Sequence, residues 1–260
     1  MIGSHKVALI TINNKKSMIS VDKVYQRVLA ILNKENRGYM TPQEYNLLAN
    51  QAQLEIFEQY FYDLNQYNRR GEINNEYANI VKNIKEKIDL FKITDFNLSI
   101  SSGKYILPDN LYRLGTIQYS KTGTSSYTSG TITSTCEIEP ISTNEFIYIN
   151  SSPLTSPSTN YPVYLRDGNN ITVYPSTITA TIQCSYIKKP LEVNWTYFEV
   201  NGVALYNSAA ADHQNYELHA SEETVLVNKI LTYAGLVIKQ PDIIQVADAK
   251  ENKKITQEKS

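Results

Sequence analysis

The sequence predicts an α+β fold in which helical segments flank a central region of antiparallel strands. Apolar residues recur at helical spacing before about residue 94 and again after about residue 220, and alternate with polar residues in between. A chain of 260 residues can bury one large or two small cores. We therefore expect an N-terminal helical bundle, a central antiparallel β-sandwich or barrel, and C-terminal helices that pack back on the bundle.

The N-terminal bundle is predicted to contain three helices joined by short connections. The first covers residues 20–35, with Ser20 as its N-cap and apolar side chains at helical spacing. The third lies within residues 76–93, where Tyr77 and three isoleucines recur at the same spacing. Residues 1–18 precede the bundle as an arm or extension, with an apolar run too short to span a membrane.

The second predicted helix, residues 41–67, begins with strong start signals. Thr41 can cap the helix, Pro42 suits its first position, and Glu44 can complete a capping box. The helix carries two adjacent apolar faces, although a surface helix usually buries one. The first face holds Tyr45, Leu48, Ala49, Ala52, Ile56, Tyr60 and Tyr67, and the second holds Leu47, Leu54, Phe57, Phe61 and Leu64. The helix is either central to its own bundle or meets another subunit.

Strands dominate the centre, which we assign to residues 95–195. Residues 120–142 are too rich in Ser, Thr and Gly for a helix. Two alternating runs flank Asp167-Gly168-Asn169-Asn170 and predict a hairpin. A further strand follows and ends at Pro190. About six or seven strands of this kind suggest a small sandwich or barrel.

Helical spacing returns in the C-terminal segment, residues 196–260. Ser221 can cap a helix over residues 222–239, whose first residues Glu222 and Glu223 suit the positive end of the helix dipole. A short final helix and a polar tail follow. The domain prediction is therefore an arm (1–18), a helical domain (19–94), a β-domain (95–195) and a C-terminal helical segment (196–260).

Tyrosine is unusually frequent, with 20 residues against 6 phenylalanines and 1 tryptophan. Tyrosine suits surfaces that become buried on assembly, since its hydroxyl can remain hydrogen-bonded or wet. It also has a high strand propensity. The count favours an interaction protein over one that only fills strands.

Composition excludes several classes of function. Twenty-five basic and 26 acidic residues give a net charge of −1 without long blocks of either sign, so no large nucleic-acid-binding face is expected. Cys136 and Cys184 lack metal-type spacing and are interpreted as reduced, partly buried thiols; a disulfide between strands is the alternative.

No residue set predicts catalysis, a metal site or a cofactor. His213 and His219, with Asp212 and Glu217 nearby, do not match a familiar zinc pattern. Glu137 and Glu139 alternate along a strand and could form the carboxylate pair of a glycosidase, but such a pair is ordinary on a solvated sheet. Arg69 and Arg70 form a small basic turn that is either solvated or docks an acidic neighbour.

Four stretches of the chain together resemble ring proteins under the portal of crAss-like, short-tailed bacteriophages. They are GYMTPQEYNLLANQAQLEIFEQYF, LPDNLYRLGTI, YPVYLRDGNNITVYPSTI and YELHASEETVLVNKILTYAGLVIKQPDI. The resemblance covers most of residues 19–250, and residues 1–17 depart from it. LPDNLYRL is also similar to the step from helices into the β-domain of podovirus head-to-tail adaptors.

This resemblance implies a non-enzymatic virion protein of the portal vertex, assembled in the cytoplasm of the bacterial host. It would form a ring of twelve copies, contact the portal and neighbouring tail proteins, and enclose double-stranded DNA that passes without specific binding. No membrane contact is implied. The second face of helix 41–67 would then meet a neighbouring copy. The predicted subunit-interface residues are Leu47, Leu54, Phe57, Phe61, Leu64, Leu226 and Ile230.

A carbohydrate-binding module or a fibre-associated tail module is the alternative function, because the centre is rich in Ser, Thr and Tyr. The flanking helices argue against a fibre, which would show long heptads or repeats.

Overall fold

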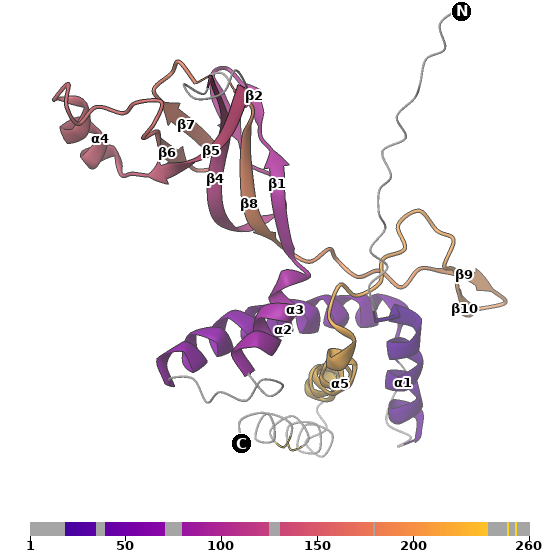
Figure 1. Ribbon diagram of the computed structural model, residues 1–260. Coiled ribbons are helices and arrows are strands. Elements are labelled where there is room, and N and C mark those ends of the chain that lie inside the picture. Colours follow the sequence, from indigo (N-terminus) through magenta and orange to yellow (C-terminus); the bar gives the residue numbers. More distant parts are fainter. Residues whose placement is uncertain are drawn as a thin grey trace, which may run out of the picture. The chain divides into compact units, whose positions relative to one another are not determined.

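The computed structural model describes residues 19–34, 40–70, 80–124, 131–178 and 180–238, with isolated helical positions at 249 and 253. The predicted arm 1–18, Tyr77 and most of the final helix lie outside these ranges. The chain divides into a helical unit, Met1–Leu90 with Pro190–Ser260, and a barrel unit, Phe91–Lys189. This confirms the α+β class, with helices before and after a central sheet (Figure 1).

The helical unit is built around a long second helix. The third and C-terminal helices pack on it, and the C-terminal helix also contacts the first. The C-terminal helix thus packs back on the bundle as predicted. The elements of this unit are α1 (Val21–Lys34), α2 (Pro42–Arg70), α3 (Ile80–Asp89), the strands β9 (Tyr197–Val200) and β10 (Val203–Tyr206), the 3-10 turn η1 (Ala220–Glu222) and α5 (Glu223–Ile238).

The predicted capping box opens α2. The Thr41 backbone N–H donates to Glu44 Oε2 at 2.9 Å, and the Glu44 N–H donates to Thr41 Oγ1 at 3.3 Å. The hydrogen bonds from Thr41 lower the pKa of the Glu44 carboxyl. The start of α5 differs from the prediction, because His219 caps the preceding turn by accepting the Ser221 N–H. Ser221 lies inside this turn, so the helix proper begins at Glu223, one residue later than predicted.

The core of the helical unit combines aromatic rings with a buried pair of hydroxyls. The Tyr25 ring lies 4.6 Å from Tyr45 and 4.4 Å from Trp195, measured between ring centroids. Tyr45 donates to the Val21 carbonyl at 3.0 Å, so the 2.8 Å contact with Tyr216 is a bond that Tyr216 donates. Burial raises the pKa of both tyrosines, which therefore stay protonated.

Three amide side chains of α2 hold the segment that follows the barrel unit. We call Asn46, Asn50 and Gln53 the amide ladder; at spacing i, i+4 and i+7 they share one helix face. Asn50 accepts the Val193 N–H at 2.6 Å and donates to the Val193 carbonyl at 3.0 Å. Asn46 bonds the backbone of Trp195 in the same way, whereas Gln53 donates to the Leu191 carbonyl and accepts the Glu217 N–H.

These bonds explain why the units divide a few residues earlier than the sequence predicts. The helical unit resumes at Pro190 rather than after residue 195, because the amide ladder binds residues 191–195 to α2. The barrel unit begins at Phe91 rather than at residue 95, since the Phe91 carbonyl accepts the Lys188 N–H within that unit.

The barrel unit contains an eight-stranded, nearly closed sheet with strand order β1-β8-β4-β5-β6-β7-β3-β2. The two outermost strands of this order are consecutive in the chain and are separated only by Leu98, whose N–H donates to the Ile182 carbonyl. One continuous segment therefore begins and ends the sheet. The strands are β1 (Lys92–Asn97), β2 (Ser99–Ser101), β3 (Lys104–Ile106), β4 (Leu111–Thr124), β5 (Thr131–Pro140), β6 (Val163–Asp167), β7 (Asn170–Tyr174) and β8 (Ile182–Lys188).

Two features of the sheet test the predictions of a hairpin at Gly168 and of a wholly antiparallel sheet. The predicted hairpin is formed by β6 and β7, with Gly168 at a φ of 60° in the turn. The sheet is not wholly antiparallel, however, because β5 and β6 pair in parallel. Parallel neighbours need a long crossover, and the chain supplies it through the helix α4 (Thr143–Asn150), which Figure 1 shows standing out beside β6 and β7.

The barrel interior is apolar and includes one of the two cysteines. Ile171, Ile182 and Cys184 have no exposed surface. Cys136 and Cys184 are both free thiols, as predicted. Cys136 is half-buried and Cys184 is buried. Burial raises the pKa of the Cys184 thiol to about 11.

Candidate interaction surfaces

The structure separates the seven predicted interface residues into two groups. Leu47 is 71% exposed, and Leu54 and Leu64 are half-buried. The other four are buried in the helical unit: Phe57, Phe61, Leu226 and Ile230. These four are core residues, because α3 and α5 both pack on α2 and α5 turns its own apolar side inward. The interface prediction is corrected for them and stays a prediction for the three leucines.

The residues considered for metal binding point to separate partners. His213 Nε2 lies 3.2 Å from the Tyr206 hydroxyl, and Asp212 accepts from Asn194 at 2.9 Å. Glu217 accepts the Leu191 N–H at 2.9 Å, and His219 caps η1. Within the described residues, no group of three or more His, Cys, Asp or Glu side chains is arranged to hold a metal ion.

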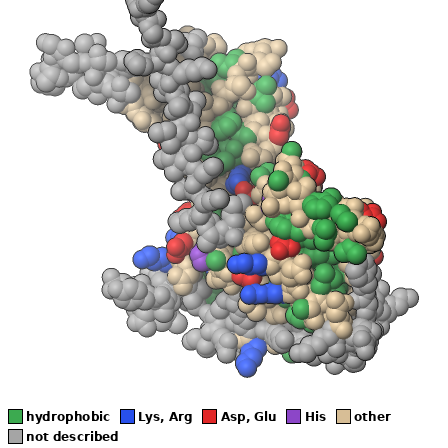
Figure 2. Space-filling view, turned by 90° about the vertical axis from the view of Figure 1, so that its right-hand side faces the viewer, with side chains coloured by type: hydrophobic (Ala, Val, Ile, Leu, Met, Phe, Trp, Pro, Cys, Tyr) green, Lys and Arg blue, Asp and Glu red, His purple; other side chains and the backbone are tan. Residues whose placement is uncertain are grey.

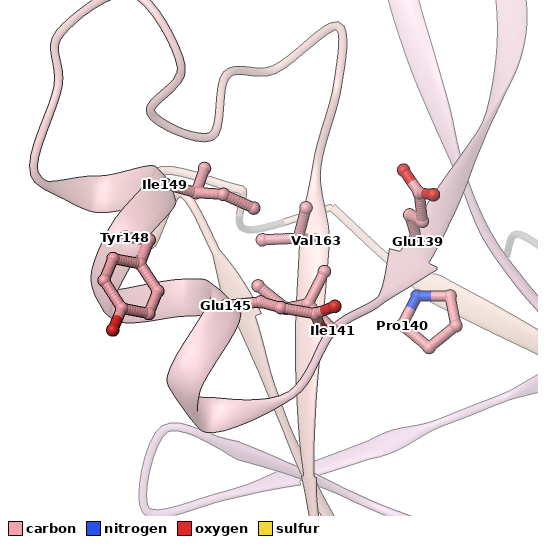
Figure 3. A pocket seen from close by; sticks show the side chains of 7 residues that line it. All are labelled: Glu139, Pro140, Ile141, Glu145, Tyr148, Ile149 and Val163. Atoms are coloured by element: carbon pink, nitrogen blue, oxygen red, sulfur yellow. The ribbon is translucent and has the colours of Figure 1, made fainter.

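The carboxylates considered for glycosidase chemistry do not share a site. Glu137 and Glu139 are both exposed on β5, but only Glu139 lines a hollow of about 340 Å³ between the strands and α4. In Figure 3, Glu139 and Tyr148 stand on opposite sides of this hollow, with Val163 and Ile149 between them. Glu145 also lines it, but Oε2 of this residue accepts the Ser142 N–H in the α4 capping box, which lowers its pKa.

The basic turn after α2 offers one described side chain. Arg69 is exposed, whereas the Arg70 side chain lies outside the described residues. Solvation of this turn and docking of an acidic neighbour both stay predictions.

The crossover between β5 and β6, which we call the α4 segment (residues 141–162), exposes large apolar side chains on a well-held frame. Its helix has a complete capping box at Ser142 and Glu145, and Phe146 packs against Tyr174 of β7 with ring centroids 4.2 Å apart. No residue of α4 is buried. The exposed side chains are Ile147 (61%), Tyr148 (77%), Leu154 (94%) and Tyr161 (81%).

A second apolar surface belongs to the hairpin β9–β10 of the helical unit. Its two residues of turn, Asn201 and Gly202, both have positive φ, at 51° and 78°, as a type I′ turn requires. Figure 1 shows the hairpin standing away from the helices of its unit. Figure 2 views the side of Figure 1 on which the hairpin lies, and hydrophobic side chains gather on that face.

The root of the hairpin is held by Trp195, which is 2% exposed. The rings of Tyr197 and Tyr206 both stack on it, each at 5.7 Å between centroids. Trp195 Nε1 donates to Asp22 at 3.0 Å, and the Asn207 N–H donates to the Thr196 carbonyl at 2.9 Å. The hairpin is thus fixed at its base.

No protein-family model matches this chain, and no curated protein matches it significantly. Among the described residues, none of the helices is both long and apolar enough to cross a membrane.

The sequence analysis missed both surfaces, although each carries a signal. Asn201-Gly202 between alternating apolar residues is a strong hairpin signal. Ser142 followed three residues later by Glu145 is a capping box. Exposure itself leaves no such signal, because the same apolar residues could equally fill a core.

Proposed function

We propose that this protein is a structural subunit that assembles with copies of itself into a ring at the portal vertex of a short-tailed bacteriophage. The ring would enclose the channel through which double-stranded DNA passes, and would contact the portal and neighbouring tail proteins. The support comes from the resemblance of four stretches of the sequence to such ring proteins and from the exposed apolar surfaces of the chain.

The α4 segment is the observation that carries this proposal. The helix buries none of its residues, and the segment around it exposes four large apolar side chains, two in the helix and two after it, so this exposure gains little within its own chain. Apolar surface of this kind marks a protein-protein contact, and tyrosine is enriched at the centre of such contacts. Two of the four side chains are tyrosines, Tyr148 and Tyr161, which places part of the tyrosine excess on a surface.

Other tyrosines have a different role. Tyr25, Tyr45 and Tyr216 lie in the core of the helical unit, and Tyr105, Tyr119 and Tyr186 lie in the core of the barrel unit. The tyrosine count alone is therefore weaker support for assembly than the exposed positions are.

The test is the oligomeric state of the purified full-length chain, by mass photometry, with negative-stain electron microscopy for its shape. We expect closed rings. The double variant Tyr148→Ser with Leu154→Ser should lose them while keeping its circular dichroism spectrum, and the variant Ile100→Ser, which removes an exposed apolar side chain from β2, should keep them. A chain that stays monomeric at every concentration, with and without purified portal protein, would contradict the proposal.

Carbohydrate binding is a second candidate, favoured by the hollow beside α4. Its volume falls within the range of small-molecule pockets, and it combines apolar side chains with Glu139 and Glu145. Titration calorimetry with bacterial surface oligosaccharides tests it. Binding that Glu139→Gln weakens and Glu137→Gln leaves unchanged would support this function.

A further inference from the structure

The hairpin β9–β10 has two chemically different faces. Leu205 pairs with Phe198, and Val203 pairs with Val200, so all four side chains lie on one face of the hairpin. The opposite face carries Tyr197 and Tyr206, which stack on Trp195. We call the face formed by Phe198, Val200, Val203 and Leu205 the free face.

The free face is exposed and carries no charge. Its side chains are 49%, 43%, 59% and 43% exposed in the order just given. The neighbouring charged residue of the strands, Glu199, pairs with Ala204 and lies on the other face. A surface without charge does not suit nucleic acid, which is held through its phosphates by Lys and Arg. The chemistry of the free face fits an apolar protein surface.

Contacts at the root of the hairpin order its strands before any partner binds. An isolated two-stranded hairpin is at best marginally stable in water, and within the described part of the chain these two strands pair only with each other. The stacking of Tyr197 and Tyr206 on Trp195 fixes the strands in advance, so a partner pays little entropy to order them.

The size of the free face indicates what kind of partner it serves. Four side chains about half exposed offer on the order of 300 Å², well under the roughly 800 Å² per partner of a standard interface. The hairpin alone is therefore too small for a stable one-to-one complex. A subunit of a closed ring, however, makes each head-to-tail contact twice, once with either neighbour.

We infer that the free face of the hairpin docks on the α4 segment of an adjacent copy of this chain. Among the described residues, the α4 segment carries the most strongly exposed sequence-local set of large apolar side chains outside the hairpin, Ile147, Tyr148, Leu154 and Tyr161, at 61–94%. When two different apolar surfaces of one chain meet, the contact is heterologous, and such contacts form a ring if the rotation between neighbours closes. This inference rests on the proposed function, since it names the surfaces through which neighbouring copies meet.

The first test compares variants of full-length protein by analytical ultracentrifugation. Phe198→Ser with Leu205→Ser should weaken self-association about tenfold or more, as the loss of central interface side chains does. The single variant Val203→Glu should do the same by placing a charge in the contact. Ile100→Ser serves as the matched control, and thermal melts establish that each variant is folded. Unchanged self-association of both folded hairpin variants would overturn the inference.

The second test locates the contact by disulfide capture. Leu205→Cys and Tyr148→Cys are made in separate copies, each also carrying Cys136→Ser to remove the half-exposed native thiol. Mild oxidation should give linked dimers only when the two copies are mixed. Linked dimers from Leu205→Cys alone would overturn the assignment, because the hairpins would then meet each other.

The two tests separate this inference from the proposed function. If the hairpin variants still form rings and the mixed copies do not link, the inference fails and the ring proposal stands. If the chain forms no ring but the mixed copies link, the contact stands and the ring proposal fails.

Discussion

The two units of this chain are stabilised internally by different kinds of bonds. The barrel unit is one continuous piece of chain, Phe91–Lys189, whose strands are joined by backbone ladders around an apolar interior. The helical unit is assembled from two pieces that are distant in sequence, and side chains join them: the amide ladder, the Tyr45–Tyr216 bond and the 2.6 Å ion pair between Lys87 and Glu222. The helical unit should therefore be more sensitive to the loss of single side chains, and the barrel unit to changes of its backbone spacing.

The largest effect is expected for Trp195→Ala. This buried ring contacts Tyr25 and supports both tyrosines of the hairpin root, so its loss should reduce the free energy of unfolding of the helical unit by about 3–5 kcal/mol. Urea denaturation followed by helical circular dichroism measures this, and protection of the Cys184 thiol reports on the barrel unit. Phe198→Ala, an exposed aromatic, is the control. Equal losses in both units would contradict the proposed difference between them.

Asn50→Ala should follow, with a loss of about 2–3 kcal/mol, because it leaves the buried N–H and carbonyl of Val193 without their partner. Gln51→Ala, one residue away on the exposed side of α2, should cost little. Hydrogen exchange at the amide of Val193 gives a local reading. If that amide exchanges equally slowly in both variants, the ladder does not hold the segment.

Gly115→Ala tests the barrel unit through its backbone. A Cβ at this position of β4 would lie 2.8 Å from the Ser185 carbonyl oxygen in β8, so the strands must shift, at a cost of about 1–3 kcal/mol. The neighbouring residue Thr116 is exposed, so the control substitution Thr116→Ala should be tolerated. We expect Cys184 to be alkylated at a lower urea concentration, with the helical circular dichroism signal unchanged; an equal loss of the helical signal would contradict this account.

Thr41→Ala should have the smallest effect, about 1 kcal/mol, through loss of the α2 cap. Because the folded state lowers the pKa of Glu44, its stabilising contribution is present above the ordinary carboxyl range and is lost as the pH falls through the folded pKa. The difference from wild type in thermal midpoint should therefore shrink in acid. Gln43→Ala should show no such pH dependence, and a difference that is constant with pH would contradict this account.

The sequence predicted features that depend on local chemistry. The capping box of Thr41 and Glu44, the β6–β7 turn at Gly168 and the helical spacing of α1 all follow from neighbours in the chain. It could not distinguish Leu47 from Phe57, because both lie on the second stripe of α2 and only the partner helices decide which is covered. The amide ladder and the parallel β5–β6 pair were also beyond reach, since each depends on a partner far away in the chain.

The closure of the sheet by one continuous segment has a consequence for synthesis. Lys92 at the start of the barrel unit is paired with Ile187 near its end, so the first and last residues of this unit lie next to each other. On the ribosome, α1 to α3 emerge first but cannot acquire the bonds that Val193, Trp195 and Tyr216 supply. All residues of the barrel unit are available once Lys189 has emerged. This unit can therefore fold before the helical unit, whose C-terminal residues have not yet been synthesised. Synthesis from the N-terminus would thus give a fixed order of folding, in which the barrel unit folds before the helical unit that surrounds it in sequence.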